Sequence, residues 1–185
     1  MSKELANIIK ACLKGDRKSQ KQFYLMFANR LYGLCLRYSK NEDEAKDLLQ
    51  EGFIKIFENL KQYKHKGSLE GWMRRIIINT AMERFRKSSN FLLFDNEAKM
   101  ESVQVRYQHI VEDLNTKDLL KMVQSLSPQY RTVFNLYAIE GYSHQEIAQK
   151  LNITEGTSKS NLSRARDMLK KKINSEIKIK TTKII

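Results

Sequence analysis

The stretch SHQEIAQKLNITEGTSKSNLSRAR, from Ser143 to Arg166, decides the fold of the second half of the chain. Ser143 followed three residues later by Glu146 is the signature of a capping box, so a helix is predicted to begin here. The segment Asn152-Ile153-Thr154 predicts a tight turn, after which Thr154 caps a second helix that runs to Lys172. Two short helices joined by so short a turn predict a helix-turn-helix.

The second of these helices has two distinct faces when its residues are placed at 100° intervals. The inward face, which must pack on the preceding helices, carries Ser158, Leu162, Ala165 and Leu169. The opposite face carries Ser160, Ser163, Arg164, Asp167 and Lys171, with Lys159 and Arg166 on one flank. Small hydroxyl residues beside arginine let a helix enter a major groove while arginine contacts a base edge. The alternative is an ordinary solvated, charged face.

The rest of the chain also predicts helices, so the fold class is all-α. One proline, seven glycines and steady apolar spacing at i, i+3 and i+4 leave little room for strands. Apolar stripes begin at Leu5 and at Phe23, and a short one runs from Leu119 to Leu126. Ser127 and Pro128 predict the start of a helix that ends at Gly141.

The composition indicates an intracellular protein with a polyanionic partner. The 185 residues carry a net charge of +13, of which residues 1–90 contribute +9, residues 91–112 −2 and residues 113–185 +6. Two basic blocks suggest two contact surfaces for nucleic acid, although a basic chain can also be inert. Cys12 and Cys35 lie on apolar stripes and are expected to be buried thiols. No apolar run of about 20 residues occurs, so membrane insertion is not expected.

The segment from Asp43 to Lys61 predicts a helix with an apolar outward face. Its buried side is defined by Ala45, Leu49, Gly52, Ile56 and Leu60. Directly opposite lie Asp47, Gln50, Ile54, Glu58 and Lys61, with Glu51 and Phe57 at the edges. An isoleucine and a phenylalanine beside acidic residues suggest a docking surface for another protein. Isolated exposed apolar residues are common, which is the alternative.

The segment GSLEGWMRRIIINTAMERFRK, from Gly67 to Lys87, predicts a helix with a polar and basic stripe. Ser68 can cap it, and Ile77 and Ile78 are expected in the core. The stripe consists of Arg75, Asn79, Met82 and Arg86, bordered by Trp72 and Ile76. Such a surface suits single-stranded or melted nucleic acid, because arginines hold phosphates and flat groups stack on unpaired bases. Trp72 can equally be a core residue.

Three motifs in order resemble the bacterial RNA polymerase sigma factors. They are DEAKDLLQEGFIKIFENL, WMRRIIINTAMERFRK and LSPQYRTVFNLYAIEGYSHQEIAQKLNITEGTSKSNLSRAR. Because only the second and fourth regions of that family are matched, the chain resembles its extracytoplasmic-function (ECF) group. The resemblance implies two small helical domains joined by a flexible linker. Residues 1–90 form the region 2 domain, 91–112 the linker, 113–175 the region 4 domain and 176–185 a tail.

The resemblance implies a role for each matching position. The residues implied in docking on the clamp of the largest subunit of core RNA polymerase are Asp47, Leu48, Gln50, Glu51, Ile54 and Phe57. Those implied in opening and recognising the −10 promoter element are Trp72, Arg75, Ile76, Asn79 and Arg86, with Asn79 beside a pocket for a flipped base. Those implied at the −35 element are Lys159, Ser160, Ser163 and Arg164, with Arg166 on phosphate.

The chain departs from the family pattern at two positions of the second helix. Ser158 stands where many members have valine, and Asn161 where many have arginine. These departures put the core packing at Ser158 and one backbone contact at Asn161 in doubt.

The implied function is that of a dissociable promoter-specificity subunit. Its partners are core RNA polymerase and promoter DNA, and an anti-sigma factor is a further candidate. We expect a cytoplasmic protein, nucleoid-associated when in holoenzyme, with no cofactor. The alternatives are a helix-turn-helix regulator that binds DNA without polymerase and an enzyme acting on nucleic acid. No metal-ligand cluster, phosphate loop or nucleophile–base pair is recognisable, so neither catalytic nor metal-binding residues are expected.

Overall fold

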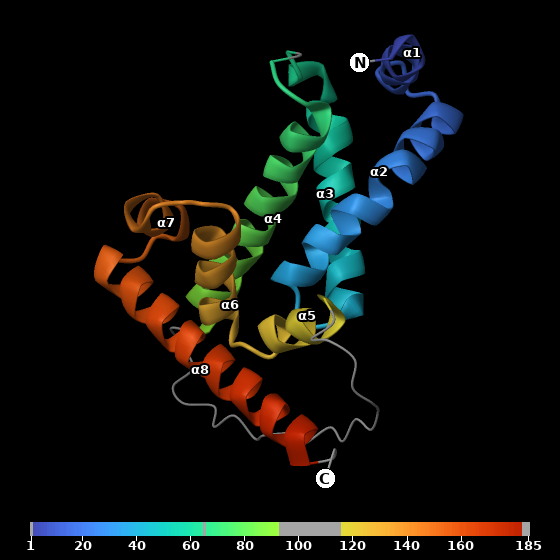
Figure 1. Ribbon diagram of the computed structural model, residues 1–185. Helices are drawn as coiled ribbons and strands as arrows, with labels where there is room; N and C mark the ends of the chain where they lie inside the picture. The colour runs from blue at the N-terminus through green and yellow to red at the C-terminus, as the bar shows by residue number, and fades with distance from the viewer. Residues whose placement is uncertain (1, 65, 93–115, 183–185) are drawn as a thin grey trace. The chain divides into compact units, whose positions relative to one another are not determined.

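The computed structural model describes residues 2–64, 66–92 and 116–182, with side chains described to residue 87 and from 117 to 175. Every regular element in these ranges is a helix, as predicted (Figure 1). The linker predicted at residues 91–112 lies almost wholly outside the described residues. The chain divides into two compact units, Met1–Glu83 and Arg84–Ile185, which we call unit 1 and unit 2.

Unit 1 contains α1 (Lys3–Cys12), α2 (Arg17–Tyr38), α3 (Glu42–Asn59), the 3₁₀ turn η1 (Leu60–Gln62) and most of α4 (Leu69–Leu92). Side-chain caps begin these helices at Ser2, Asp16, Asn41 and Ser68, each accepting a hydrogen bond from a backbone N–H three residues on. A cap of this kind stabilises a helix by about 1 kcal/mol. The cap predicted at Ser68 is thereby confirmed.

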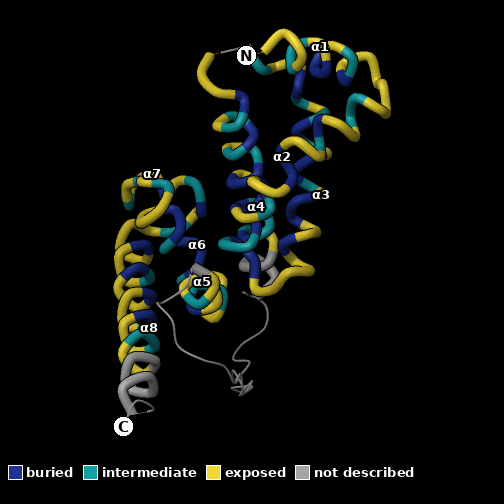
Figure 2. Tube along the Cα trace, turned by 45° about the vertical axis from the view of Figure 1, so that its right-hand side comes forward, coloured by how far each residue is buried: buried dark blue, intermediate teal, exposed yellow. Residues whose placement is uncertain are grey.

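The core of unit 1 lies between α2, α3 and α4, whose buried residues face one another (Figure 2). Helix α2 packs on α3 partly through aromatic rings, with Phe23 and Phe57 centroids 5.7 Å apart and Tyr24 and Phe53 centroids 4.5 Å apart. Gly52 on α3 allows α4 to approach closely, because a Cβ there would collide with Cδ1 of the fully buried Ile77. The buried face predicted for α3 is therefore correct.

Two residues of the predicted apolar stripes are exposed instead of buried: Leu119, and Leu13 at the end of the stripe that begins at Leu5. Leu13 follows the last turn of α1 and is 40% exposed, and Leu119 in the first turn of α5 is 44% exposed. Both lie at helix ends. The apolar stripe of the sequence extends to these positions, but no neighbouring element covers them. The two cysteines, Cys12 and Cys35, are buried free thiols as expected.

Unit 2 contains α5 (Thr116–Gln124), α6 (Pro128–Phe134), the π-helix η2 (Asn135–Ile139), α7 (His144–Leu151) and α8 (Glu155–Thr182). One core cluster joins α5 to α8 through Met122, Leu126, Ala165 and Leu169. The buried guanidinium of Arg131 donates to the carbonyls of Gln124 and Leu126, at 2.9 and 3.3 Å. Arg131 thus supplies a donor to backbone carbonyls at and just after the end of α5, where a helix no longer provides all of its own donors.

The helix predicted from Ser127 to Gly141 is regular only in its first part. Ser127 caps it and Pro128 occupies its first turn, as predicted. From Asn135 the helix widens into π geometry, in which the Glu140 N–H donates to the Asn135 carbonyl five residues earlier, at 3.0 Å. Gly141 then ends the element with a φ of 77°, a conformation that favours glycine.

The helix-turn-helix predicted from the sequence is confirmed in α7 and α8. Ser143 and Glu146 form the reciprocal capping box of α7. Asn152 adopts the left-handed conformation, with a φ of 56°, and thereby turns the chain sharply. Thr154 accepts a hydrogen bond from the Thr157 N–H at 3.0 Å and begins α8. Helix α8 runs to Thr182 and not to Lys172, so most of the predicted tail is helical.

Candidate protein and nucleic-acid interfaces

The exposed side of α3 combines acidic, polar and apolar side chains, as predicted. We call this surface the α3 face, and it consists of Asp47, Gln50, Ile54 and Glu58, all exposed. Ile54 is 59% exposed, which is high for a large apolar side chain. A protruding apolar group surrounded by carboxylates fits a partner with a small apolar pocket and basic residues around it.

Two residues implied in docking are less exposed than the α3 face. Leu48 is only 2% exposed and belongs to the core, so its role in docking stays a prediction that its burial does not favour. The reason is helix geometry, because Leu48 and Leu49 share the buried side of α3. Phe57 is half-buried, with its ring packed on Phe23 and on Phe53, and contributes only its edge to the surface.

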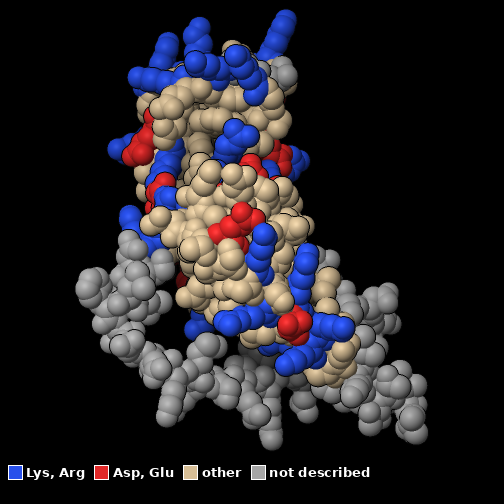
Figure 3. Space-filling model, turned by 90° about the vertical axis from the view of Figure 1, so that its left-hand side faces the viewer, with Lys and Arg blue, Asp and Glu red and all other residues tan. Residues whose placement is uncertain are grey.

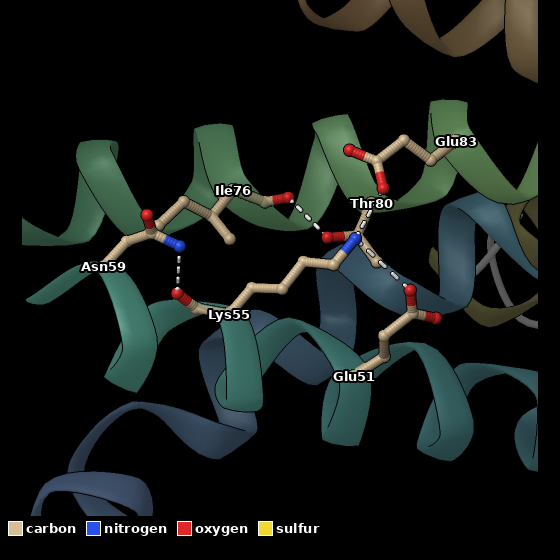
Figure 4. Close-up of polar contacts among 6 residues, drawn as sticks. All are labelled: Glu51, Lys55, Asn59, Ile76, Thr80 and Glu83. Carbon is tan, nitrogen blue, oxygen red and sulfur yellow. Dashed lines mark hydrogen bonds and ion pairs between the residues drawn. The ribbon is translucent and has the colours of Figure 1, made fainter.

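Glu51 belongs to an ionic contact that joins α3 to α4 (Figure 4). The ammonium group of Lys55 lies 2.6 Å from the Glu83 carboxylate on α4 and 3.3 Å from that of Glu51. Burial opposes the charged form of Lys55, but the hydrogen bonds to Glu83 and Glu51 outweigh it and raise the pKa of Lys55. The expected surface residue Glu51 therefore also fixes how α4 lies on α3.

Helix α4 exposes only part of its predicted polar stripe. Arg75 and Asn79 are exposed and Ile76 is half-buried, so these three can meet a ligand. Met82 is 4% exposed, which corrects its placement on the stripe. The exposed strip of α4 narrows there, because the neighbouring Ala81 is buried too. Arg86, near the described end of the helix, is half-buried.

Trp72 is half-buried and lies against the turn that precedes α4. Its ring centroid is 5.5 Å from that of Tyr63, and the Tyr63 hydroxyl donates to the Gly67 carbonyl at 2.9 Å. Trp72 therefore packs on this turn and also presents an accessible edge. Lys64 and Lys66 in the turn are exposed, and lysine and arginine side chains gather at this end of unit 1 (Figure 3).

The outward face of α8 is exposed as predicted. Ser160, Ser163 and Arg164 are all exposed, while Ser158, Leu162, Ala165 and Leu169 are buried. Lys159 pairs with Glu155 at 2.8 Å, and this hydrogen bond lowers the pKa of Glu155. Basic side chains also line this helix in Figure 3. A narrow serine face with arginine at its centre has the shape and donors that a major groove accepts.

Three contacts in unit 2 were not predicted. The Arg166 guanidinium lies 5.6 Å from the centroid of the Tyr137 ring. His144 stacks on the same ring and its Nδ1 lies 2.9 Å from the hydroxyl of the buried Ser158. The only sequence signal for them is the serine at position 158, which departs from the apolar pattern of the face.

The described parts of the chain contain neither a candidate metal site nor a candidate membrane span. No group of three or more His, Cys, Asp or Glu side chains within them could hold a metal ion. No helix in the same ranges is long and apolar enough to cross a membrane.

Comparison with known proteins assigns the chain to a family. The model for Sigma-70 region 2 matches residues 23–91, and that for Sigma-70, region 4 matches residues 116–169. The ECF RNA polymerase sigma factor SigW of Bacillus subtilis is 30% identical over 176 residues, covering 89% of this chain and 94% of that relative. The chain belongs to the ECF sigma factors.

Two further matches are found among known proteins. The ECF sigma factor SigE of Mycolicibacterium smegmatis is 32% identical over 154 residues, covering 77% of this chain but 57% of that relative. A solved structure of the sigma factor RpoE with the anti-sigma factor NepR from Bartonella quintana matches with a TM-score of 0.49 and 26% identity, over 83% of this chain and 96% of that one. As an ECF sigma factor, the chain is a transcription initiation factor.

Proposed function

We propose that this ECF sigma factor binds core RNA polymerase through the α3 face and directs it to promoters through α4 and α8. The observation that carries the proposal is the arrangement of three exposed surfaces of different chemistry. The α3 face is acidic and apolar, α4 exposes Arg75 and Asn79 beside Trp72, and α8 exposes serines and Arg164. Such a set suits one protein partner, one melted strand and one duplex.

Each surface has a distinct task in this proposal. The α3 face docks on the clamp of the largest polymerase subunit, and α8 binds the −35 element, with Arg166 on phosphate. Trp72, Arg75, Ile76, Asn79 and Arg86 hold the melted −10 element. The sigma factor thus acts in the cytoplasm and on the nucleoid, and an anti-sigma factor that covers the α3 face would hold it inactive.

The docking step is tested by reconstitution with core polymerase. We expect Asp47→Ala with Ile54→Ala to abolish co-purification, because the pair removes both the charge and the apolar group of the α3 face. Leu25→Ala is the matched control, since Leu25 is an apolar residue 64% exposed on α2. Co-purification unchanged by the double substitution contradicts the docking role. Binding to duplex DNA without polymerase would instead favour an independent regulator.

Base recognition by α8 is tested with a duplex selected by the wild-type holoenzyme from a randomised library. Arg164→Ala is expected to cost about 1–3 kcal/mol on the selected duplex and little on random DNA. Equal losses on both duplexes contradict base recognition.

Strand opening is tested with Asn79→Ala and permanganate footprinting of promoter thymines. We expect weaker opening at unchanged duplex affinity, because Asn79 contacts only the melted strand in this proposal. Asn29→Ala, an exposed asparagine on α2, is the control. A variant that opens the promoter as well as the wild type removes Asn79 from this role.

A further inference from the structure

Four side chains of unit 2 form a connected group across the helix-turn-helix, and only one of them has a role in the proposed function. Tyr137 lies on η2, His144 begins α7, and Ser158 and Arg166 lie on α8. The His144 and Tyr137 ring centroids are 4.5 Å apart with an interplanar angle of 23°. Helix α7 packs on both η2 and α8, so the group spans the whole motif.

Ser158 is a polar residue in an apolar position. It is 0% exposed and lies on the face of α8 that also buries Leu162 and Ala165. A buried hydroxyl needs a hydrogen-bond partner, since without one it destabilises the fold. His144 Nδ1 lies 2.9 Å from it and supplies that partner. A hydrogen bond depends on direction, so it fixes the rotation of α8 relative to the start of α7 more closely than an apolar contact does.

Tyr137 extends this group to the DNA-facing side of α8. It is 36% exposed and sits in the π-helix, a geometry that often marks functional positions. One ring contacts both His144 and the guanidinium of Arg166, which lies 5.6 Å from its centroid. An arginine held over a ring keeps N–H groups at its edge, and these can donate to a phosphate.

We propose that Tyr137, His144 and Ser158 are positioning residues that hold α8 and the Arg166 guanidinium ready for the −35 duplex. The His144–Ser158 hydrogen bond sets the orientation of the helix, and the Tyr137 ring sets that of Arg166. The inference rests on the proposed function of α8. It adds residues outside the exposed face of α8 as determinants of how the DNA is held.

The first test compares Tyr137→Ala with Tyr137→Phe in reconstituted holoenzyme, on a duplex selected by the wild type. Alanine removes the ring, so we expect roughly tenfold weaker binding and a salt slope lowered by about one, as for the loss of one phosphate contact. Phenylalanine keeps the ring and is expected to stay within about twofold of the wild type. Ile139→Ala is the control. Ile139 is 41% exposed on the same π-helix, but its aliphatic side chain offers no aromatic ring to Arg166, which lies over Tyr137.

The decisive measurement is the salt slope of Tyr137→Ala combined with Arg166→Ala. If the ring acts through the guanidinium, the double variant has the same slope as Arg166→Ala alone. Additive slopes, or a Tyr137→Ala slope equal to that of the wild type, overturn this half of the inference. A purely structural role for Tyr137 would lower the melting temperature while the salt slope of the folded protein stayed unchanged.

The second test addresses the hydrogen bond. His144→Asn places an amide near the position of Nδ1, whereas His144→Gln places it near Nε2. We therefore expect the asparagine variant to keep more of the preference for the selected over a random duplex. Ser158→Ala should lower that preference and should add little to His144→Ala. Ser158→Ala with unchanged preference, at wild-type thermal stability, overturns the positioning role.

Duplex selection by the wild-type holoenzyme distinguishes a failure of the positioning role from a failure of the proposed function of α8. A wild-type holoenzyme that selects no duplex contradicts the proposed function of α8. Selection by the wild type with unchanged Tyr137 and Ser158 variants contradicts only the positioning role.

Discussion

Units 1 and 2 are stabilised in different ways. The described core of unit 1 is almost entirely apolar, with aromatic rings between α2 and α3 and a glycine where α4 approaches α3. Unit 2 buries Arg131, Thr132, Asn135 and Ser158 as well. Packing in unit 1 depends on side-chain volume, whereas unit 2 also depends on directed hydrogen bonds. Satisfied polar contacts inside a core fix one arrangement of the side chains, so they specify the structure of unit 2 beyond what apolar packing does.

The largest effect is expected in unit 2, from Arg131→Met. The substitution keeps apolar volume but removes the donors to the Gln124 and Leu126 carbonyls, which lie at the end of α5. Hydrogen bonds from a charged group are worth roughly 1.5–3 kcal/mol each, so we expect a loss of about 3 kcal/mol. Hydrogen exchange in α5 and α6 measures it, with Lys170→Met on the exposed side of α8 as the control. Unchanged exchange would show that unit 2 does not depend on this contact.

The volume dependence of unit 1 is tested at Gly52. Gly52→Ala is expected to cost about 1–3 kcal/mol of unfolding free energy, because the new Cβ meets Cδ1 of Ile77. Ile77→Val removes that δ-carbon, so the double variant should lose less than the sum of the two single variants. Urea unfolding of all three variants measures the coupling. Strict additivity would mean that α4 moves away from α3 without strain.

A smaller effect is expected at the helix caps, where the two units can be compared directly. Ser143→Ala in unit 2 and Asp16→Ala in unit 1 each remove one side-chain cap, for about 1 kcal/mol. Hydrogen exchange in the first turns of α7 and α2 reports each loss. If polar contacts matter more in unit 2, the loss of protection caused by Ser143→Ala should extend from α7 into α8. The loss caused by Asp16→Ala should stay within the first turn of α2. Equal spreading would remove this distinction between the units.

The smallest effect is a dependence of α7 on pH. Hydrogen bonds from the backbone and then the hydroxyl of Ser143 hold the pKa of Glu146 below its ordinary value of about 4.5. Because the folded pKa is the lower one, this stabilisation is fully present above the unfolded value and is lost as the pH falls through the folded value. The protection of the α7 amides, taken relative to the intrinsic exchange rate at each pH, should therefore fall below about pH 4.5. Glu146→Gln, which cannot ionise, should remove the dependence.

Helix faces were the most predictable feature of this chain. Stepping at 100° per residue placed the buried and exposed sides of α3 and α8 correctly, since both are long helices with one covered side. It failed at Met82, which is buried at 4% exposure, and at Leu119, which is 44% exposed. Local periodicity carries no information on how many neighbours a helix has.

The candidate surfaces were only partly predictable for a related reason. The α3 face and the serine face of α8 follow from periodicity, but the roles of their residues follow from the family resemblance and stay predictions. The contact between His144 and Ser158 could not be predicted, because it joins two helices across a turn. The π-helix had no sequence signal, since its residues would suit an ordinary α-helix equally well.

The π-helix of unit 2 also bears on how homologous sequences are aligned. A π turn holds one residue more than an α turn, so η2 accommodates an extra residue without disturbing the flanking helices. A homologue with a regular α-helix here would be one residue shorter between Arg131 and Gly141. An ungapped alignment with such a homologue would pair Tyr137 with the wrong position. The residue of the homologue that corresponds to Tyr137 is better identified by superposing the two structures than by aligning the two sequences.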